Sequence, residues 1–496
     1  MNAYLETGSQ RPIVQDSSVP LLIIATGAAL SLGAFLALAG GGIALLVVAG
    51  GLLMMAALVR PVIGLYAAML FALAGNIHLN DPNYAAGSRL FLSVREIAVN
   101  LTPTELVLMF AAIGLCIRLV FDDEVQFRAG ALLLPIAFFM TAIALAVAVG
   151  ISRGADMAVL RQEVRGLVLL PILYLLITHF VTRQQQVTRL MWTFVVGANI
   201  MAAESVYRYL TQVRSGYSLD LSQSMAFAHE NSLLCGAAIV LLLARLVWTR
   251  NIVQEWRCVA LMLLPLAAML VMHRRAGLVA LDGGVALLCV VLLREKVRTF
   301  LVVVPLAVLV FGAVVAATWN NPGGSGEFAR SFRAATGSAD VTARDQSSND
   351  YRDREALNIR LNIKADPLVG LGFGRPYAFY VPVSNLSADW PLWSSVPHNS
   401  VLWIWMDAGL LGFISLTVLF AAALCRSMQL LRLSATAMKP YAFTFGAIVL
   451  MFFMYSWVDL GMITPRTLIL FGLALGGIGT LGIIAESERK GADQAA

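Results

Sequence analysis

The chain has 496 residues, of which 59% are hydrophobic and only 13% charged, and its mean hydropathy is +0.79. A soluble domain is nearer half apolar and a quarter charged, so the excess of apolar residues here must face lipid. The mild net charge of +6 gives no indication of a nucleic-acid partner. The composition therefore predicts an all-α polytopic membrane protein.

The apolar sequence divides into runs that are long enough to cross a membrane, for which a helix needs about 20 residues. We predict about fourteen spans, within a range of 12–14, because the first two runs are rich in Gly and Ala and nearly continuous. The predicted runs are Val19–Leu38, Gly42–Leu58, Pro61–His78, Thr104–Val120, Ala131–Val149, Gly166–Val181, Val187–Tyr209, Ser232–Trp248, Val259–Met272, Ala276–Leu293, Phe300–Thr318, Ser400–Leu424, Tyr441–Trp457 and Thr467–Ile484.

These runs divide the chain into four parts. Residues 1–318 hold the first eleven spans, residues 319–397 form one large hydrophilic loop, residues 398–484 hold the last three spans, and residues 485–496 form a tail. With the N-terminus inside, basic residues such as Arg60, Arg294 and Arg489 fall on the cytoplasmic side, as the positive-inside tendency requires. We therefore expect a bacterial inner-membrane protein with both termini cytoplasmic and the large loop periplasmic.

The outer face predicted in this way carries many arginines, which oppose the insertion bias. The planar guanidinium fork suits phosphate oxygens, so an anionic ligand is one explanation. The alternative is a GC-rich genome that writes Arg in place of Lys. The short outer segments contribute Arg89, Arg95, Arg153, Arg161, Arg165, Arg214, Arg274, Arg275 and Arg466. The large loop adds Arg330, Arg333, Arg344, Arg352, Arg354, Arg360, Lys364 and Arg375.

Two arginine pairs in the outer segments are candidates for binding a ligand. Arg161 and Arg165 are spaced i,i+4 and can point together into a cavity mouth, or reach the interface beside Glu163. The turn His273-Arg274-Arg275 follows a short apolar run, so it lies at or slightly below the membrane surface. Arginine buried at full depth costs about 2.5–3.5 kcal/mol. A lipid-linked diphosphate could compensate this cost, and Asp282 is the alternative partner.

The large loop begins with flexible sequence and then changes character. Residues 352–364 place Leu357 with Leu361, and Ile359 with Ile363, at i,i+4, which predicts an amphipathic helix with a basic face. Such a helix can lie on the outer membrane surface. The glycines of residues 367–374 lack the preceding strand of a nucleotide-binding loop, so we interpret them as tight loop packing or as an amide nest for an anion.

His398 stands where the large loop re-enters the membrane, within Pro397-His398-Asn399-Ser400. Histidine can take a proton near neutral pH, so His398 is a candidate general base toward a sugar hydroxyl. A structural role is the alternative. The sequence contains no HExxH, P-loop or GxSxG motif and no acidic cluster on the outer side. We therefore predict chemistry without a metal or a cofactor, in which arginines supply the positive charge.

At these residues the sequence resembles the superfamily of bacterial O-antigen ligases and O-antigen polymerases. The matching features are Arg274-Arg275-Ala276-Gly277, Arg352 about fifteen residues before Pro367–Gly372, His398–Leu402 followed by Gly409–Gly412, and, more weakly, His229-Glu230-Asn231. The resemblance runs from roughly residue 150 onward. Arg274 replaces a usual small hydroxyl residue, and Asp407 replaces a frequent Glu. Fourteen spans exceed the twelve usual in a ligase, which leans slightly toward a polymerase.

The resemblance implies a metal-independent, inverting glycosyltransferase of surface polysaccharide (O-antigen or exopolysaccharide) assembly. The donor would be an oligosaccharide on undecaprenyl diphosphate, and the acceptor a hydroxyl of a glycan or of the lipid A-core. Arg275 and Arg352 would act at the diphosphate with His398 as the base. Substrate binding would fall to Arg274, Arg354, Arg360, Arg161 and Arg165. Besides the bilayer, polysaccharide assembly proteins are possible partners.

Two other functions are compatible with the sequence. The protein could transport an anion such as bicarbonate or a lipid-linked sugar, although transporters place their binding sites near the membrane midplane, whereas the charges here gather at one face. It could also be a structural scaffold for polysaccharide assembly.

Overall fold

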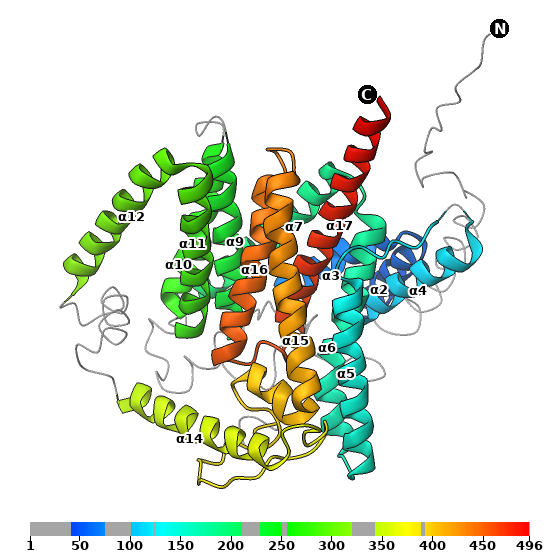
Figure 1. Ribbon diagram of the computed structural model, residues 1–496, viewed down its shortest axis with the longest axis vertical. Helices are drawn as coiled ribbons and strands as arrows, with labels where there is room; N and C mark the ends of the chain where they lie inside the picture. The colour runs from blue at the N-terminus through cyan, green and yellow to red at the C-terminus, as the bar shows by residue number, and fades with distance from the viewer. Residues whose placement is uncertain are drawn as a thin grey trace.

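The computed structural model describes residues 41–74, 101–123, 125–210, 229–249, 255–272, 274–319, 343–387 and 392–495. The first predicted span, Val19–Leu38, lies outside the described residues, as do Arg89, Arg95, Arg214, Arg330, Arg333 and His273. Within the described part the regular structure is helical (Figure 1). The helices are α2 (Gly41–Val59), α3 (Pro61–Ala74), α4 (Pro103–Phe121), α5 (Leu133–Ser152), α6 (Met157–Phe180), α7 (Gln184–Arg208), α9 (Asn231–Trp248), α10 (Trp256–Met272), α11 (Arg275–Glu295), α12 (Val297–Thr318), α14 (Ala343–Ala365), α15 (Ser400–Leu433), α16 (Lys439–Val458) and α17 (Pro465–Ala495).

Each predicted apolar run from Gly42–Leu58 onward coincides with one of these helices. Among the described residues, nine helices are long and apolar enough to cross a membrane, and three shorter apolar helices accompany them. The helical character predicted from composition is therefore confirmed for the described residues, and the nine apolar helices support a multi-pass protein. The total of fourteen spans and the periplasmic side of the large loop stay predictions.

Polar caps fix where several helices begin. Thr102 and Glu105 form a capping box at the start of α4, with Pro103 in the first turn. Asp156 accepts hydrogen bonds from the backbone at the start of α6, and Asn399 does the same for Leu402 at the start of α15. The cap at Asn399 fixes the point at which the large loop ends, immediately after His398.

The centre of the bundle is the packing of α17 against α6, α15 and α16. Phe452 of α16 stacks on Phe471 of α17, with ring centroids 4.4 Å apart. Three glycines of α17 allow α6 to approach closely, because an added Cβ would meet Leu173, Ile177 or Tyr174: they are Gly472, Gly476 and Gly479. By contrast, α12 packs on α11 and leans away from the bundle, with Val302 and Leu309 exposed where lipid would lie (Figure 1).

Helix α14 lies across one end of the bundle, opposite to the C-terminal end of α17 (Figure 1). It is longer than the predicted helix 352–364, and its buried side includes Ile359 and Ile363 of the apolar stripe that we expected. Leu357 is 43% exposed, whereas Asn358 and Asn362 are buried. Both asparagines bond to the extended segment that follows, Asn358 to the N–H and C=O of Val381 and Asn362 to those of Ala378, at 2.7–2.9 Å. A carboxamide matches a peptide group in shape and polarity, so α14 is held by its own loop as well as by α15.

The glycine segment after α14 packs tightly against the bundle. Gly370 has φ +79°, and Gly409, at a non-helical point inside α15, has φ +63°. A Cβ on Gly370 would lie 2.5 Å from the Gly409 nitrogen, so backbone meets backbone at this contact. The nearby amides of Gly372 and Gly374 donate to the Asp407 carbonyl and to Glu163. These contacts favour tight loop packing over an anion nest.

Candidate functional site

One end of the bundle gathers segments that lie far apart in the sequence. Arg153, after α5, donates to Asp366 and to the Gly370 carbonyl beyond α14, at 3.0 and 2.7 Å. Arg275, at the start of α11, donates to Asn349 of α14 at 3.1 Å. The turns before α6, α9, α11, α15 and α17 therefore share the end of the bundle that α14 covers (Figure 1).

His398 is held at this end by a buried carboxylate. Glu355 of α14, only 3% exposed, accepts hydrogen bonds from the backbone N–H of His398 at 3.0 Å and from its Nδ1 at 3.1 Å. Because a carboxylate only accepts, Nδ1 carries the ring proton, and Nε2 of the neutral ring presents a lone pair. Within the described residues, Nε2 has no hydrogen-bond partner. A histidine oriented in this way can accept a proton at Nε2.

Tyr351 and the two asparagines complete the setting of Glu355. The ring of Tyr351 packs edge-on against His398, with centroids 5.9 Å apart, and its hydroxyl bonds to Glu355. Burial, followed by the neighbouring Glu355 carboxylate, raises the pKa of Tyr351, so the hydroxyl stays protonated and acts as a donor. Since Asn358 lies one turn further along α14, its bonds to Val381 fix the helix on which Glu355 stands.

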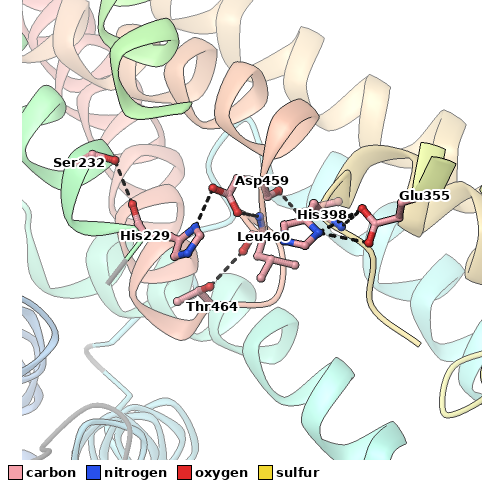
Figure 2. A network of polar contacts seen from close by, with 8 residues as sticks. His229, Ser232, Glu355, His398, Asp459, Leu460 and Thr464 are labelled. Carbon is pink, nitrogen blue, oxygen red and sulfur yellow. Dashed lines mark hydrogen bonds and ion pairs between the residues drawn. The ribbon is translucent and has the colours of Figure 1, made fainter. Parts of the chain in front are cut away.

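A second histidine lies beside the first. His229, two residues before α9, bonds through Nδ1 to Asp459 at 3.1 Å, and Asp459 follows α16 (Figure 2). Asp459 also accepts from the Leu460 N–H at 2.8 Å, and Ser400, two residues after His398, donates to the Asp459 carbonyl at 2.9 Å. Figure 2 shows Asp459 between the two histidines.

Two of the predicted arginines surround this centre. Burial acts to raise the pKa of Asp459, but the hydrogen bond from His229 and the positive charge of Arg352 hold that pKa below its usual range. Arg352 and Arg274 also act electrostatically on Tyr455, one turn before Asp459. The structure therefore places Arg352 and His398 within electrostatic reach of Asp459 and Arg274 within reach of Tyr455, while Arg275 bonds to α14.

The other predicted binding residues have contacts elsewhere. Arg165 forms an ion pair with Glu105 of α4 at 3.0 Å, while Glu163, the partner considered in the sequence, is buried and bonds to Gly374. Arg354 donates to the Pro382 carbonyl at 3.4 Å. The two remaining residues, Arg161 and Arg360, are exposed.

Sequence reasoning missed both carboxylates of the site, Glu355 and Asp459. It used His229 only within a weak resemblance. The available signal was a lone acid at the outer end of a predicted span, which is the position of Asp459 after Tyr441–Trp457. In the part of the chain that the structure describes, no group of three or more His, Cys, Asp or Glu side chains is arranged to hold a metal ion.

Comparison with known protein families identifies a match over part of the chain. Residues 260–417 match the family model described as O-antigen ligase. The match includes Arg274, Arg275, Arg352, Glu355 and His398, and it ends before Asp459. No curated protein matches the chain.

Proposed function

The chain carries a domain of the O-antigen ligase family over residues 260–417, and from this premise we propose that it transfers lipid-linked glycans at the outer face of the bacterial inner membrane. A membrane glycan-processing role follows from the family and from the nine apolar helices. The proposal adds the donor, an oligosaccharide on undecaprenyl diphosphate, and the acceptor, a hydroxyl of a glycan or of the lipid A-core. The single observation that carries it is the His398–Glu355 pair, with Arg352 in electrostatic reach of the neighbouring Asp459.

In the proposed reaction, Nε2 of His398 takes the proton of the acceptor hydroxyl as its oxygen attacks the anomeric carbon of the donor. The new C–O bond forms on the face opposite to the leaving group, so the configuration inverts. The bond from the anomeric carbon to the diphosphate oxygen breaks with both of its electrons, and undecaprenyl diphosphate departs. Glu355 stabilises the imidazolium that forms, as a carboxylate does beside a protonated histidine.

The departing diphosphate gains negative charge, which Arg352, Arg274 and Arg275 would stabilise through charge-assisted hydrogen bonds. Their charge replaces a metal in this scheme, and the diphosphate already activates the sugar. The four other predicted binding residues are better placed to contact the glycan than the diphosphate. Arg165 is already paired with Glu105, and the remaining three are exposed: Arg161, Arg354 and Arg360.

Complementation of a deletion strain tests the proposal. Wild type is compared with His398→Ala and Arg275→Ala, with surface glycan read on a gel and protein level on a blot. We expect both variants to accumulate to the wild-type level and to give no long or ligated glycan. Full restoration of glycan by both variants would refute the site assignment.

The same gel separates two versions of the reaction. A polymerase joins repeat units to one another, so its loss leaves single capped units. A ligase moves finished glycan to the lipid A-core, so its loss leaves none. We favour the polymerase slightly because the predicted number of spans exceeds the usual ligase count.

A further inference from the structure

The His229–Asp459 pair repeats the geometry of the His398–Glu355 pair. In each, a carboxylate that is almost fully buried bonds to Nδ1 of a histidine at 3.1 Å. The side chains of Asp459 and Glu355 are 4% and 3% exposed, and those of His229 and His398 are 37% and 22% exposed. Each ring therefore turns Nδ1 toward the protein. Among the described residues, neither Nε2 has a hydrogen-bond partner.

The second pair is firmly held. Ser232 donates to the His229 carbonyl at 2.9 Å, which fixes the backbone of the turn before α9. The next two residues, Glu230 and Asn231, bond to Arg466, which is 1% exposed and also donates to the Ala72 carbonyl. Both the histidine and its carboxylate thus stand on rigid backbone, as a binding group requires.

A purely structural role explains these contacts less well. Arg466 already ties the start of α9 to α3 and α17, and α9 packs directly on α16. A further structural contact between these helices would need only one ring nitrogen, and it would be more stabilising if the imidazole ring were buried. The imidazole of His229 instead keeps more than a third of its surface exposed.

The chemistry of Nε2 selects the ligand. With Nδ1–H donating to Asp459, neutral His229 presents a lone pair, which accepts a hydrogen bond from a hydroxyl. A phosphate oxygen also presents lone pairs, so it gains nothing from this nitrogen. The pair borders the proposed reaction centre, because Ser400 links the Asp459 carbonyl to the segment that carries His398 (Figure 2).

We propose that His229, oriented by Asp459, binds the acceptor sugar by accepting a hydrogen bond from one of its hydroxyl groups, while a neighbouring hydroxyl is presented to His398. This inference rests on the proposed function and adds an acceptor-binding residue to it. Both residues of the pair lie outside the matched segment 260–417. In this proposal the acceptor site is completed by the turn before α9 and by the turn between α16 and α17.

The test measures steady-state transfer by the purified full-length protein in lipid nanodiscs. The donor is the lipid-linked oligosaccharide extracted from the deletion strain, and the acceptor is the free repeat-unit oligosaccharide released from it by mild acid. We expect His229→Ala to raise the acceptor KM roughly 3- to 10-fold, the loss of one neutral hydrogen bond, with the donor KM and the saturated kcat within twofold of wild type. Asp459→Asn should also raise the acceptor KM, and His229→Gln, whose amide oxygen can accept, should restore part of the affinity.

Two controls separate binding from folding. His179→Ala removes a buried histidine of α6 whose two ring nitrogens both contact backbone groups, the Leu175 carbonyl and the Arg128 N–H. It should lower the unfolding temperature and leave the acceptor KM unchanged. The second control is the equilibrium Kd of the oligosaccharide, measured without turnover. It compares the His398→Ala protein with the double variant that also carries His229→Ala.

The outcomes are distinguishable. An unchanged acceptor KM in His229→Ala, or a rise in the donor KM alone, overturns the acceptor role. If His229→Ala does not fold, an unchanged acceptor KM in both His229→Gln and Asp459→Asn overturns it equally. Wild-type protein that folds but transfers nothing refutes the proposed function, and this inference with it.

Discussion

Glu355→Gln isolates the contribution of the carboxylate to the proposed base. The substitution keeps the shape of the side chain and removes its charge. Glu355 now accepts from the His398 backbone N–H, from Nδ1 and from Tyr351. The amide of Gln offers one acceptor oxygen, and its NH2 group would face either Tyr351 or Nδ1. Donation to Nδ1 would place the ring proton on Nε2, where it blocks the base.

The size of the effect follows from the bond that is lost. A hydrogen bond to a charged group contributes about 1.5–3 kcal/mol. The imidazolium forms only during the reaction, so its loss should appear as a fall in kcat of roughly 10- to 150-fold, with the donor KM unchanged. The assay is steady-state transfer in nanodiscs, and Asp353→Asn, an exposed carboxylate two residues away on α14, is the matched control.

A double-mutant cycle decides whether the two residues act together. If Glu355 works through His398, Glu355→Gln in a His398→Gln background should cost little more, because the partner is already lost. Wild-type kcat in Glu355→Gln, or full additivity of the two changes in a folded protein, would show that the carboxylate has no part in proton transfer.

Three further predictions concern the arginines and the packing of the loop. Arg352→Lys keeps the charge but loses the planar fork, so kcat/KM should fall roughly tenfold or more with stability retained; an unchanged value would remove Arg352 from the site. Gly370→Ala should cost about 1–3 kcal/mol of stability, measured by thermal unfolding, because its φ of +79° is strained and its Cβ would meet backbone. Gly154 has a similar φ of +82°, but a Cβ added there would meet no atom within 4 Å. An equal loss of stability in Gly154→Ala and Gly370→Ala would therefore show that the backbone contact at Gly370 contributes nothing. Arg466→Met should destabilise by about 3–5 kcal/mol by leaving a buried acid unpaired, whereas Arg489→Met, with 82% of its side chain exposed, should not.

Much of the fold was predictable because hydropathy alone determines which segments are membrane helices. The runs from Gly42–Leu58 onward coincide with helices, and the alternation of spans predicted that Arg274, His398 and Arg466 lie on one side of the membrane. The structure also places Arg352 and His398 within electrostatic reach of Asp459, and Arg274 within reach of Tyr455 one turn away. Their roles in catalysis stay predictions.

The two carboxylates were not predictable, because their partners are set by tertiary contacts. Glu355 is 43 residues from His398, and Asp459 is 230 residues from His229. A helical or strand repeat relates residues only a few positions apart, so it cannot predict pairs at this separation. The prediction for α14 was only partly right, for a related reason. Ile359 and Ile363 are buried as expected, but a spacing of i,i+4 describes Leu357 with Leu361 and equally Asn358 with Asn362. The nearby segment at Ala378 and Val381 is the reason that the asparagines are buried.

The position of the two carboxylates also bears on how the site can remain positively charged. Asp459 and Glu355 each bond to an imidazole Nδ1 at 3.1 Å, and Asp459 interacts with Arg352 only through longer-range attraction. An acid bonded directly to an arginine fork would occupy the donors that suit phosphate oxygens, as Glu105 does with Arg165. An acid bonded to Nδ1 of a histidine instead keeps Nε2 ready for a hydroxyl. The same two carboxylates can thus prepare both histidines for sugar hydroxyl groups without claiming the arginine fork that a diphosphate needs.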